Sequence, residues 1–213
     1  MRMDQDANRI LDNVIEQRRT VRAFKPEVPE VVLIEGIIHA GLWAPYAGLA
    51  VSGEQGFRKF FVMKGENPLL SQIAGLIQVQ SKVSLAKLLE EKPFLKEKPN
   101  PFMSRLSNMA DKGFPDLLKA PCLIVIAERR GLPPAEKQSL AHVVQNMWLK
   151  ATAVGLGMRL ISVIETLTDN KGFCDLLGLN MGEFAFNGCI VGYSAQEPQA
   201  GKRPDDKEVT KWM

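Results

Sequence analysis

The sequence predicts one domain of the α+β or α/β class, because helical and strand patterns alternate along its 213 residues. Hydrophobic residues make up 46% of the chain and charged residues 24%, proportions that exclude disorder, collagen-like repeats and a disulfide scaffold. No internal repeat is visible, and a chain of this length can bury a sizeable core without crosslinks. We therefore expect a single domain over residues 1–213, with a polar C-terminal extension over 194–213.

The first expected elements are two helices and a strand. Asp6 can cap a helix with a narrow apolar stripe, and this helix runs into a basic segment that Pro26 ends. A second helix with a broad apolar face begins near Pro29 and stops at Pro45. A loop rich in small residues then leads into a strand expected over Lys59 to Met63.

The middle of the chain predicts a long helix, an irregular segment and a buried strand. Residues 68–90 have a helical period and begin with a proline. Prolines and lysine–proline pairs interrupt residues 91–115, so we expect a loop or short-helix excursion that acts as a lid. Ala120 to Ala127 is a continuous apolar run, which is typical of a buried central strand.

Pro133-Pro134 opens what we expect to be the longest helix of the chain. Its apolar residues between 140 and 154 are spaced to bury one whole face, and Gly155 and Gly157 end it. The elements expected after it are a strand over Arg159 to Ile164, a short helix capped by Thr168 and closed by Gly178, and a strand over Phe186 to Tyr193.

Charge and cysteine content narrow the class of protein. The formal net charge of +3 is too small to imply nucleic-acid binding by itself. No apolar run approaches the ~18 residues of a membrane span, and the polar first residues do not resemble a signal peptide. Cys122, Cys174 and Cys189 are odd in number and lie among apolar residues, so we expect buried thiols in a reduced, cytoplasmic protein.

The common catalytic and metal-binding motifs are missing from the sequence. It has no nucleophile elbow, zinc-protease motif, P-loop or dinucleotide-binding glycine motif. His39 and His142 lie in apolar helices without acidic or cysteine partners at ligand spacing, which favours structural roles over a base or a metal site.

Three polar clusters each allow a structural and a functional interpretation. Arg18-Arg19-Thr20-Val21-Arg22 either complements a helix dipole or binds a phosphate through guanidinium forks and a hydroxyl. Gln145-Asn146 is either a pair of surface amides or part of an interface. Lys202-Arg203-Pro204 is either a solvated turn or a second basic contact.

Taken in order, several segments resemble motifs of the nitroreductase family of flavoproteins. The resemblance runs from about residue 10 to residue 212 at near-family spacing. The segments that carry it are Arg18–Phe24 (RRTVRAF), Ala44–Gly48 (APYAG), Ala120–Ile126 (APCLIVI), Gln145-Asn146 with Gly155-Leu156-Gly157, Leu177-Gly178-Leu179, Ile190–Tyr193 (IVGY), and the tail Lys202-Arg203-Pro204 with Trp212.

The resemblance implies an FMN-dependent enzyme that passes hydride from NADH or NADPH to a small acceptor, commonly a nitroaromatic or a quinone. It implies a central mixed, mainly antiparallel sheet flanked by helices, in an intertwined homodimer with two sites at the subunit interface. The helix over 140–154 would be buried between the subunits. No side chain need act as a catalytic acid or base, because the chemistry lies on the flavin.

The resemblance also assigns the phosphate end of the site. Arg18, Thr20 and Arg19 would face the phosphate and the ribityl chain, and Lys202 and Arg203 would close over the phosphate.

The ring end of the site is assigned in the same way. Arg22 would reach the pyrimidine edge, where a fixed cation makes the flavin easier to reduce. Ile161 and Ser162 would lie near the hydride-accepting N5, and Gln145 would join the binding set. The residues expected to line the ring and ribityl chain are Pro45, Tyr46, Ala47 and Gly48.

The chain departs from the family pattern at four places. Tyr46 stands for the usual Ser, Leu49 for the usual Asn and Ser162 for the usual Gly. The family's Gln-Pro-Trp motif is shifted along the chain and reads Gln55-Gly56-Phe57. We expect these changes to affect acceptor choice more than flavin binding.

The alternative functions are a specialised flavin reaction, such as reductive dehalogenation or flavin breakdown, and a non-catalytic flavin-binding or storage protein. A nucleic-acid binder is disfavoured by the low net charge and the aromatic content of only 7%.

Overall fold

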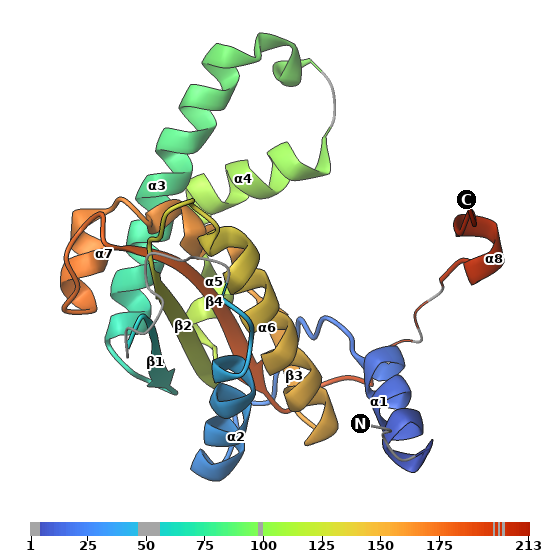
Figure 1. The fold of residues 1–213 in the computed structure, drawn as a ribbon. Coiled ribbons are helices and arrows are strands. Elements are labelled where there is room, and N and C mark those ends of the chain that lie inside the picture. Colours follow the sequence, from blue (N-terminus) through green and yellow to red (C-terminus); the bar gives the residue numbers. More distant parts are fainter. Residues whose placement is uncertain (1–4, 47–55, 98–99, 198, 200, 202) are drawn as a thin grey trace.

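The computed structural model describes residues 5–46, 56–97, 100–197, 199, 201 and 203–213. Its centre is a four-stranded sheet in the order β1-β2-β4-β3, flanked by helices on both faces (Figure 1). The strands are β1 (Arg58–Lys64), β2 (Cys122–Arg129), β3 (Gly157–Leu160) and β4 (Phe184–Gly192). The helices of eight or more residues are α1 (Gln5–Gln17), α2 (Val31–Leu42), α3 (Leu69–Glu91), α4 (Pro101–Lys112) and α6 (Glu136–Ala153). The shorter helical elements are η2 (Pro93–Lys96), α5 (Pro115–Leu118), η3 (Ser162–Leu167), α7 (Lys171–Leu176) and α8 (Asp206–Val209).

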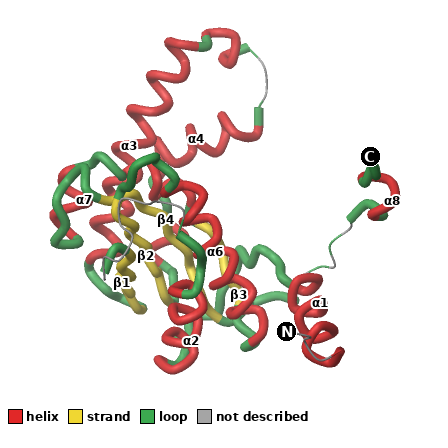
Figure 2. The backbone as a smooth tube through the Cα atoms, viewed as in Figure 1, coloured by secondary structure: helices red, strands yellow, loops and turns green. Residues whose placement is uncertain are grey.

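All three strand pairs of the sheet are antiparallel. Among the described residues, parallel pairing occurs at an isolated bridge outside the strands, between Thr20 and Met158. The expectation of a mainly antiparallel sheet is confirmed, and the four strands themselves are not mixed, because each strand runs opposite to its neighbours. Figure 2 shows the strands as one continuous layer among the helices.

The strand β2 lies in the middle of the core, as its unbroken apolar sequence predicts. Every residue from Cys122 to Glu128 is buried, because helices cover both faces of the sheet. Alternate side chains of β2 enter two apolar clusters: Leu123 and Val125 pack with α3 and α7, while Ile124 and Ile126 pack with α2 and α6.

The apolar face of α6 is buried inside this chain. Leu140, Val143 and Met147 pack with α2 and with the sheet. Most of this face is therefore covered within one chain, and the burial of α6 between two subunits stays a prediction. The helix has 18 residues, and α3, with 23, is longer, so the expectation that α6 is the longest helix is wrong.

Residues 91–115 hold more helix than the sequence predicts. Asn100 caps α4 by accepting a hydrogen bond from the Phe102 N–H, and Gly113 with φ 70° ends it. Leu106 and Ala110 are the only buried residues of α4, and so narrow an apolar stripe leaves little periodicity to detect. The upper part of α3 and the whole of α4 project together from the body of the molecule as an arm (Figure 1).

The segment after α6 differs from expectation in two places. The predicted strand over 159–164 begins earlier and ends at Leu160, and η3 follows it. Asn170, rather than Thr168, caps α7, because its side chain accepts a hydrogen bond from the Phe173 N–H.

The first helix, α1, has no buried residue. Its sequence predicts an amphipathic helix, and Ile10, Leu11 and Ile15 are 61%, 43% and 48% exposed. Asp6 lies in its first turn, and the helix ends before the arginines rather than running into them. Near the other end of the chain Trp212 is also exposed. In the part of the chain that the structure describes, no helix has the length and hydropathy needed to cross a membrane.

Candidate functional site

The basic segment after α1 is fixed to the sheet by backbone hydrogen bonds. Val21 N–H donates to the Met158 carbonyl at 3.2 Å, beside the Thr20–Met158 bridge. Lys25 N–H donates to the Tyr193 carbonyl at 2.9 Å, so the segment also follows the residues after β4. Arg18 still donates its N–H to the Val14 carbonyl of α1 at 3.0 Å, and from Thr20 onward the segment lies along the edge of β3.

Two adjoining cavities lie along this segment. The larger, of about 840 Å³, is lined by Arg18, Arg19, Arg203 and the loop at Gly155 to Gly157. The smaller, of about 560 Å³, shares the three arginines and adds Thr20 and Arg22. The structure thus brings together five of the predicted binding residues from opposite ends of the sequence.

The positive charges in these cavities repel one another. Burial lowers the pKa of Arg18, and the nearby charges of Arg19 and Arg203 lower this pKa further. Glu16 and Glu197 also line the cavities. Arg18, however, forms no ion pair with any carboxylate of the described residues. An anion placed here relieves the repulsion, so the site is suited to a phosphate.

The aromatic ring of Trp148 supports Arg18. The guanidinium carbon of Arg18 lies 4.7 Å from the centroid of this ring, a cation–π distance. Trp148 Nε1–H donates to the Arg19 carbonyl at 3.0 Å, which anchors the ring to the same segment. From the sequence this residue is only one member of the apolar face of α6, because its neighbour Arg18 lies far away in the chain.

Arg19 has a structural task. Its Nε–H donates to the Gln199 carbonyl at 2.9 Å, and its Nη1–H donates to the Glu16 and Arg18 carbonyls. A Cβ on Gly201 would lie 3.0 Å from the Arg19 Cζ, so the tail passes close to this guanidinium. Arg19 therefore ties the C-terminal tail to the end of α1, and its contact with a phosphate stays a prediction.

The other described residues of the predicted site line neither cavity. Gln145 and Ser162 are exposed, and Ile161 is buried. Tyr46 contacts the end of β2, whereas the arginine segment lies beside β3 at the other edge of the sheet, so within one chain Pro45 and Tyr46 form a second group. Ala47, Gly48 and Lys202 lie outside the described residues.

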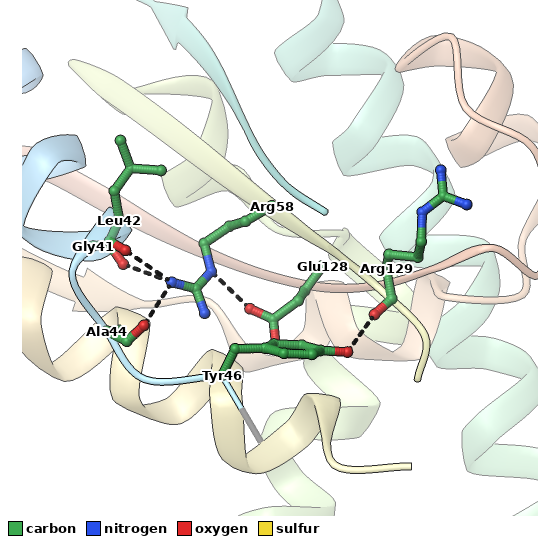
Figure 3. A network of polar contacts seen from close by, with 7 residues as sticks. All are labelled: Gly41, Leu42, Ala44, Tyr46, Arg58, Glu128 and Arg129. Atoms are coloured by element: carbon green, nitrogen blue, oxygen red, sulfur yellow. Dashed lines mark hydrogen bonds and ion pairs between the residues drawn. The ribbon is translucent and has the colours of Figure 1, made fainter. Parts of the chain in front are cut away.

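The Tyr46 side chain has two contacts with the strand ends. Its hydroxyl donates to the Arg129 carbonyl at 3.2 Å (Figure 3). Its ring centroid lies 4.7 Å from that of Phe57. Through these contacts the Tyr46 side chain links the residues after α2 to the end of β2 and to the residue before β1.

Below this loop lies a buried ion pair that the sequence analysis did not find. Arg58 Nε donates to Glu128 Oε2 at 2.7 Å, and the two side chains are 2% and 0% exposed (Figure 3). Burial raises the pKa of Glu128, nearby Glu136 adds to this shift, and the Arg58 charge opposes it. The residues face each other across the β1–β2 pair. Their charges within apolar stretches are the one pattern in the sequence that points to such a pair.

We expected the histidines to have structural roles and not to bind a metal ion. His39 is exposed and its Nε2 accepts a hydrogen bond from Trp43 Nε1–H at 2.9 Å. Within the described ranges, no group of three or more His, Cys, Asp or Glu side chains could hold a metal ion.

Comparison with known proteins identifies the family. The model of the nitroreductase family matches residues 15–193, so the chain belongs to this family, a class of oxidoreductases. No curated protein sequence matches it.

Solved structures share the fold at low sequence identity. A nitroreductase with bound FMN from Bacteroides fragilis has a TM-score of 0.70 at 16% identity, covering 95% of this chain and 98% of that one. A BluB-like flavoprotein from Clostridium difficile also has a TM-score of 0.70, at 18% identity, with the same coverage of 95% and 98%. A nitroreductase with bound FMN from Desulfitobacterium hafniense has a TM-score of 0.63 at 18% identity, covering 100% of each chain.

Proposed function

We propose that this protein is an FMN-dependent oxidoreductase that takes hydride from NADH or NADPH and passes it to a small acceptor such as a nitroaromatic or a quinone. The observation that carries the proposal is the cationic cavity, in which Arg18 and Arg203 meet at the edge of the sheet. Family membership supports the class of reaction, and FMN is bound in related structures.

The chemistry of the cavity fits the phosphate end of FMN. The phosphate of FMN is close to doubly negative at neutral pH, and guanidinium forks bind phosphate oxygens through charge-assisted hydrogen bonds. Arg18 has no carboxylate partner among the described residues, so its fork is available to a ligand. Gly157 allows the loop wall to lie close to the basic segment, since a Cβ there would lie 2.5 Å from Val21 Cγ2.

The protein contributes position and charge. Bound FMN would supply the hydride-transfer chemistry between the nicotinamide donor and the acceptor. Arg18, Thr20 and Arg203 hold the phosphate and ribityl end, and Arg22, exposed in the smaller cavity, supplies a cation at the pyrimidine edge. Such a cation favours the reduced, negatively charged form of a flavin.

We propose that the active form is a homodimer with each FMN at the subunit interface. Two observations support it: the predicted binding residues fall into two groups within one chain, and the apolar stripe of α1 is uncovered. A second subunit can supply both the missing group and the missing cover. Light scattering should give twice the chain mass of 23.6 kDa at micromolar concentration, and a stable monomer would refute this part of the proposal.

The function is tested with the purified full-length chain. FMN should bind and should be released on denaturation, and the FMN-loaded protein should oxidise NADH or NADPH when a quinone is added. A protein that binds no FMN refutes the proposal. A protein that binds FMN without accelerating donor oxidation supports the storage alternative.

A further inference from the structure

We infer that Arg58 and Glu128 are positioning residues for the flavin-contacting residues Pro45 and Tyr46. The inference rests on the proposed function, in which these two residues face the flavin ring and its ribityl chain. The buried pair holds the end of α2 and the start of the loop against the strand ends. Loss of this support should weaken contact with the flavin ring and leave the phosphate contact unchanged.

The Arg58 guanidinium binds the end of α2 directly. Its Nη1 donates to the Gly41 carbonyl at 2.9 Å and to the Ala44 carbonyl at 3.1 Å (Figure 3). The last carbonyls of a helix lack partners within the helix. Trp43, the residue after α2, has φ −79°, so no left-handed glycine ends this helix. Backbone N–H groups of Trp43 and Ala44 donate to the His39 and Gly41 carbonyls, and Arg58 adds a side-chain donor to Gly41 and joins it to Ala44 beyond the helix.

A second tie holds the next part of the loop. Tyr46 donates to the carbonyl of Arg129, the residue after Glu128, and packs on Phe57, the residue before Arg58. Contacts to Gly41, Ala44 and Tyr46 therefore come from the last residue of β2, from the first residue of β1 and from Phe57 just before it. Because these strands are hydrogen-bonded to each other, the loop is attached to a rigid base.

The pair is better suited to fixing geometry than to adding stability. Burial of two charges costs solvation free energy, and apolar residues of similar size often stabilise a core equally well. Arg58 Nη2 and Glu128 Oε1 are buried without a hydrogen-bond partner among the described residues, a further cost. An apolar pair could not replace the fork of Arg58, which contacts Glu128 and the α2 carbonyls at the same time.

The test compares ring binding with phosphate binding in the full-length chain. Arg58→Lys keeps the charge and loses the fork, Glu128→Gln removes the counter-charge, and Tyr46→Phe removes only the hydroxyl tie. Arg130→Ala is the matched control, because it removes a surface ion pair with Asp169. Dissociation constants for FMN and for riboflavin are measured by flavin fluorescence at a temperature where each variant is folded. Hydrogen exchange at the Trp43 and Ala44 amides is measured without flavin.

Arg58→Lys and Glu128→Gln should weaken FMN and riboflavin binding by the same factor, about tenfold or more, and should speed exchange at both amides. Tyr46→Phe should weaken both ligands about threefold, and the control should match the wild type. A variant with a lower melting temperature but unchanged dissociation constants and exchange would show that the pair is only structural and overturn the inference. If Arg58→Lys and Glu128→Gln do not fold, unchanged binding and exchange in Tyr46→Phe would overturn it.

Failure of the proposed function gives a different result. If the wild type binds neither flavin, the proposed function fails, while the exchange rates still decide whether the pair holds the end of α2. Loss of FMN binding alone, with riboflavin binding retained, would place the effect at the phosphate and also overturn the inference.

Discussion

The sharpest test of the cationic cavity is Arg18→Ala. Arg18 is half-buried, stacks on Trp148 and has no carboxylate partner among the described residues, so its guanidinium is held ready for an anion. A hydrogen bond to a charged group contributes about 1.5–3 kcal/mol. At ~1.4 kcal/mol per decade, the loss of one such bond should weaken FMN binding roughly 10- to 150-fold.

The variant itself should fold. Removing Arg18 ends its repulsion with Arg19 and Arg203, which offsets the lost stacking on Trp148. The melting temperature should therefore change by only a few degrees, and the binding measurement compares two folded proteins.

The assay titrates FMN and riboflavin separately by the quenching of flavin fluorescence. Riboflavin has no phosphate, so Arg18→Ala should change its affinity much less. Arg203→Ala should act in the same direction but more weakly, because Arg203 is exposed. Arg105→Ala, an exposed arginine on α4 that lines neither cavity, is the control. Unchanged FMN affinity in Arg18→Ala, or an equal loss for both ligands, would refute a phosphate role for Arg18.

Three further predictions concern other parts of the molecule. Trp148→Leu removes the ring beneath Arg18 and should weaken FMN binding roughly 2- to 30-fold by titration, with riboflavin affinity nearly unchanged. Shortening residues 91–115 should change KM for bulky acceptors in steady-state assays at unchanged flavin content, and a folded variant without flavin would argue against a lid. Burial raises the pKa of Cys122 to about 12, so its reactive thiolate is about 10⁻⁴ of the total at pH 8 and increases tenfold per pH unit. Alkylation followed by mass spectrometry should label Cys122 only after unfolding, and rapid labelling of the native protein would contradict its burial.

The sequence predicts best the features that local patterns determine. The unbroken apolar run of β2 and the proline-led α3 appear where expected, because burial on both faces or a helical period is visible within one segment. The family resemblance, rather than either basic cluster by itself, predicted that Arg18 and Arg203 would share one site, and the structure brings both to the same cavities. Their contact with a phosphate stays a prediction.

Features that depend on distant partners were missed. Arg58 and Glu128 are 70 positions apart, and only the antiparallel register of β1 and β2 places them opposite each other. Trp148 and Arg18 are 130 positions apart in the sequence, and the packing of α6 brings the ring beneath the guanidinium. The hydrogen bond from Trp148 to the Arg19 carbonyl, 129 positions away, has the same origin. The mixed sheet was expected from the resemblance, and strand direction cannot be derived from the period of one strand.

The arm formed by α3 and α4 begins and ends at nearly the same place. A Cβ on Gly113 would lie 3.7 Å from the Gln78 Cβ, and Gln78 Nε2–H donates to the Asp111 carbonyl at 2.9 Å. The chain therefore leaves the body near residue 78 and returns near residue 113 across a gap that a short linker can close. Segments whose two ends lie close together can be inserted into a protein without moving the rest of it. Residues 79–112 can therefore be treated as a replaceable helical hairpin. A shorter, longer or foreign hairpin joined at residues 78 and 113 should leave the register of the sheet unchanged.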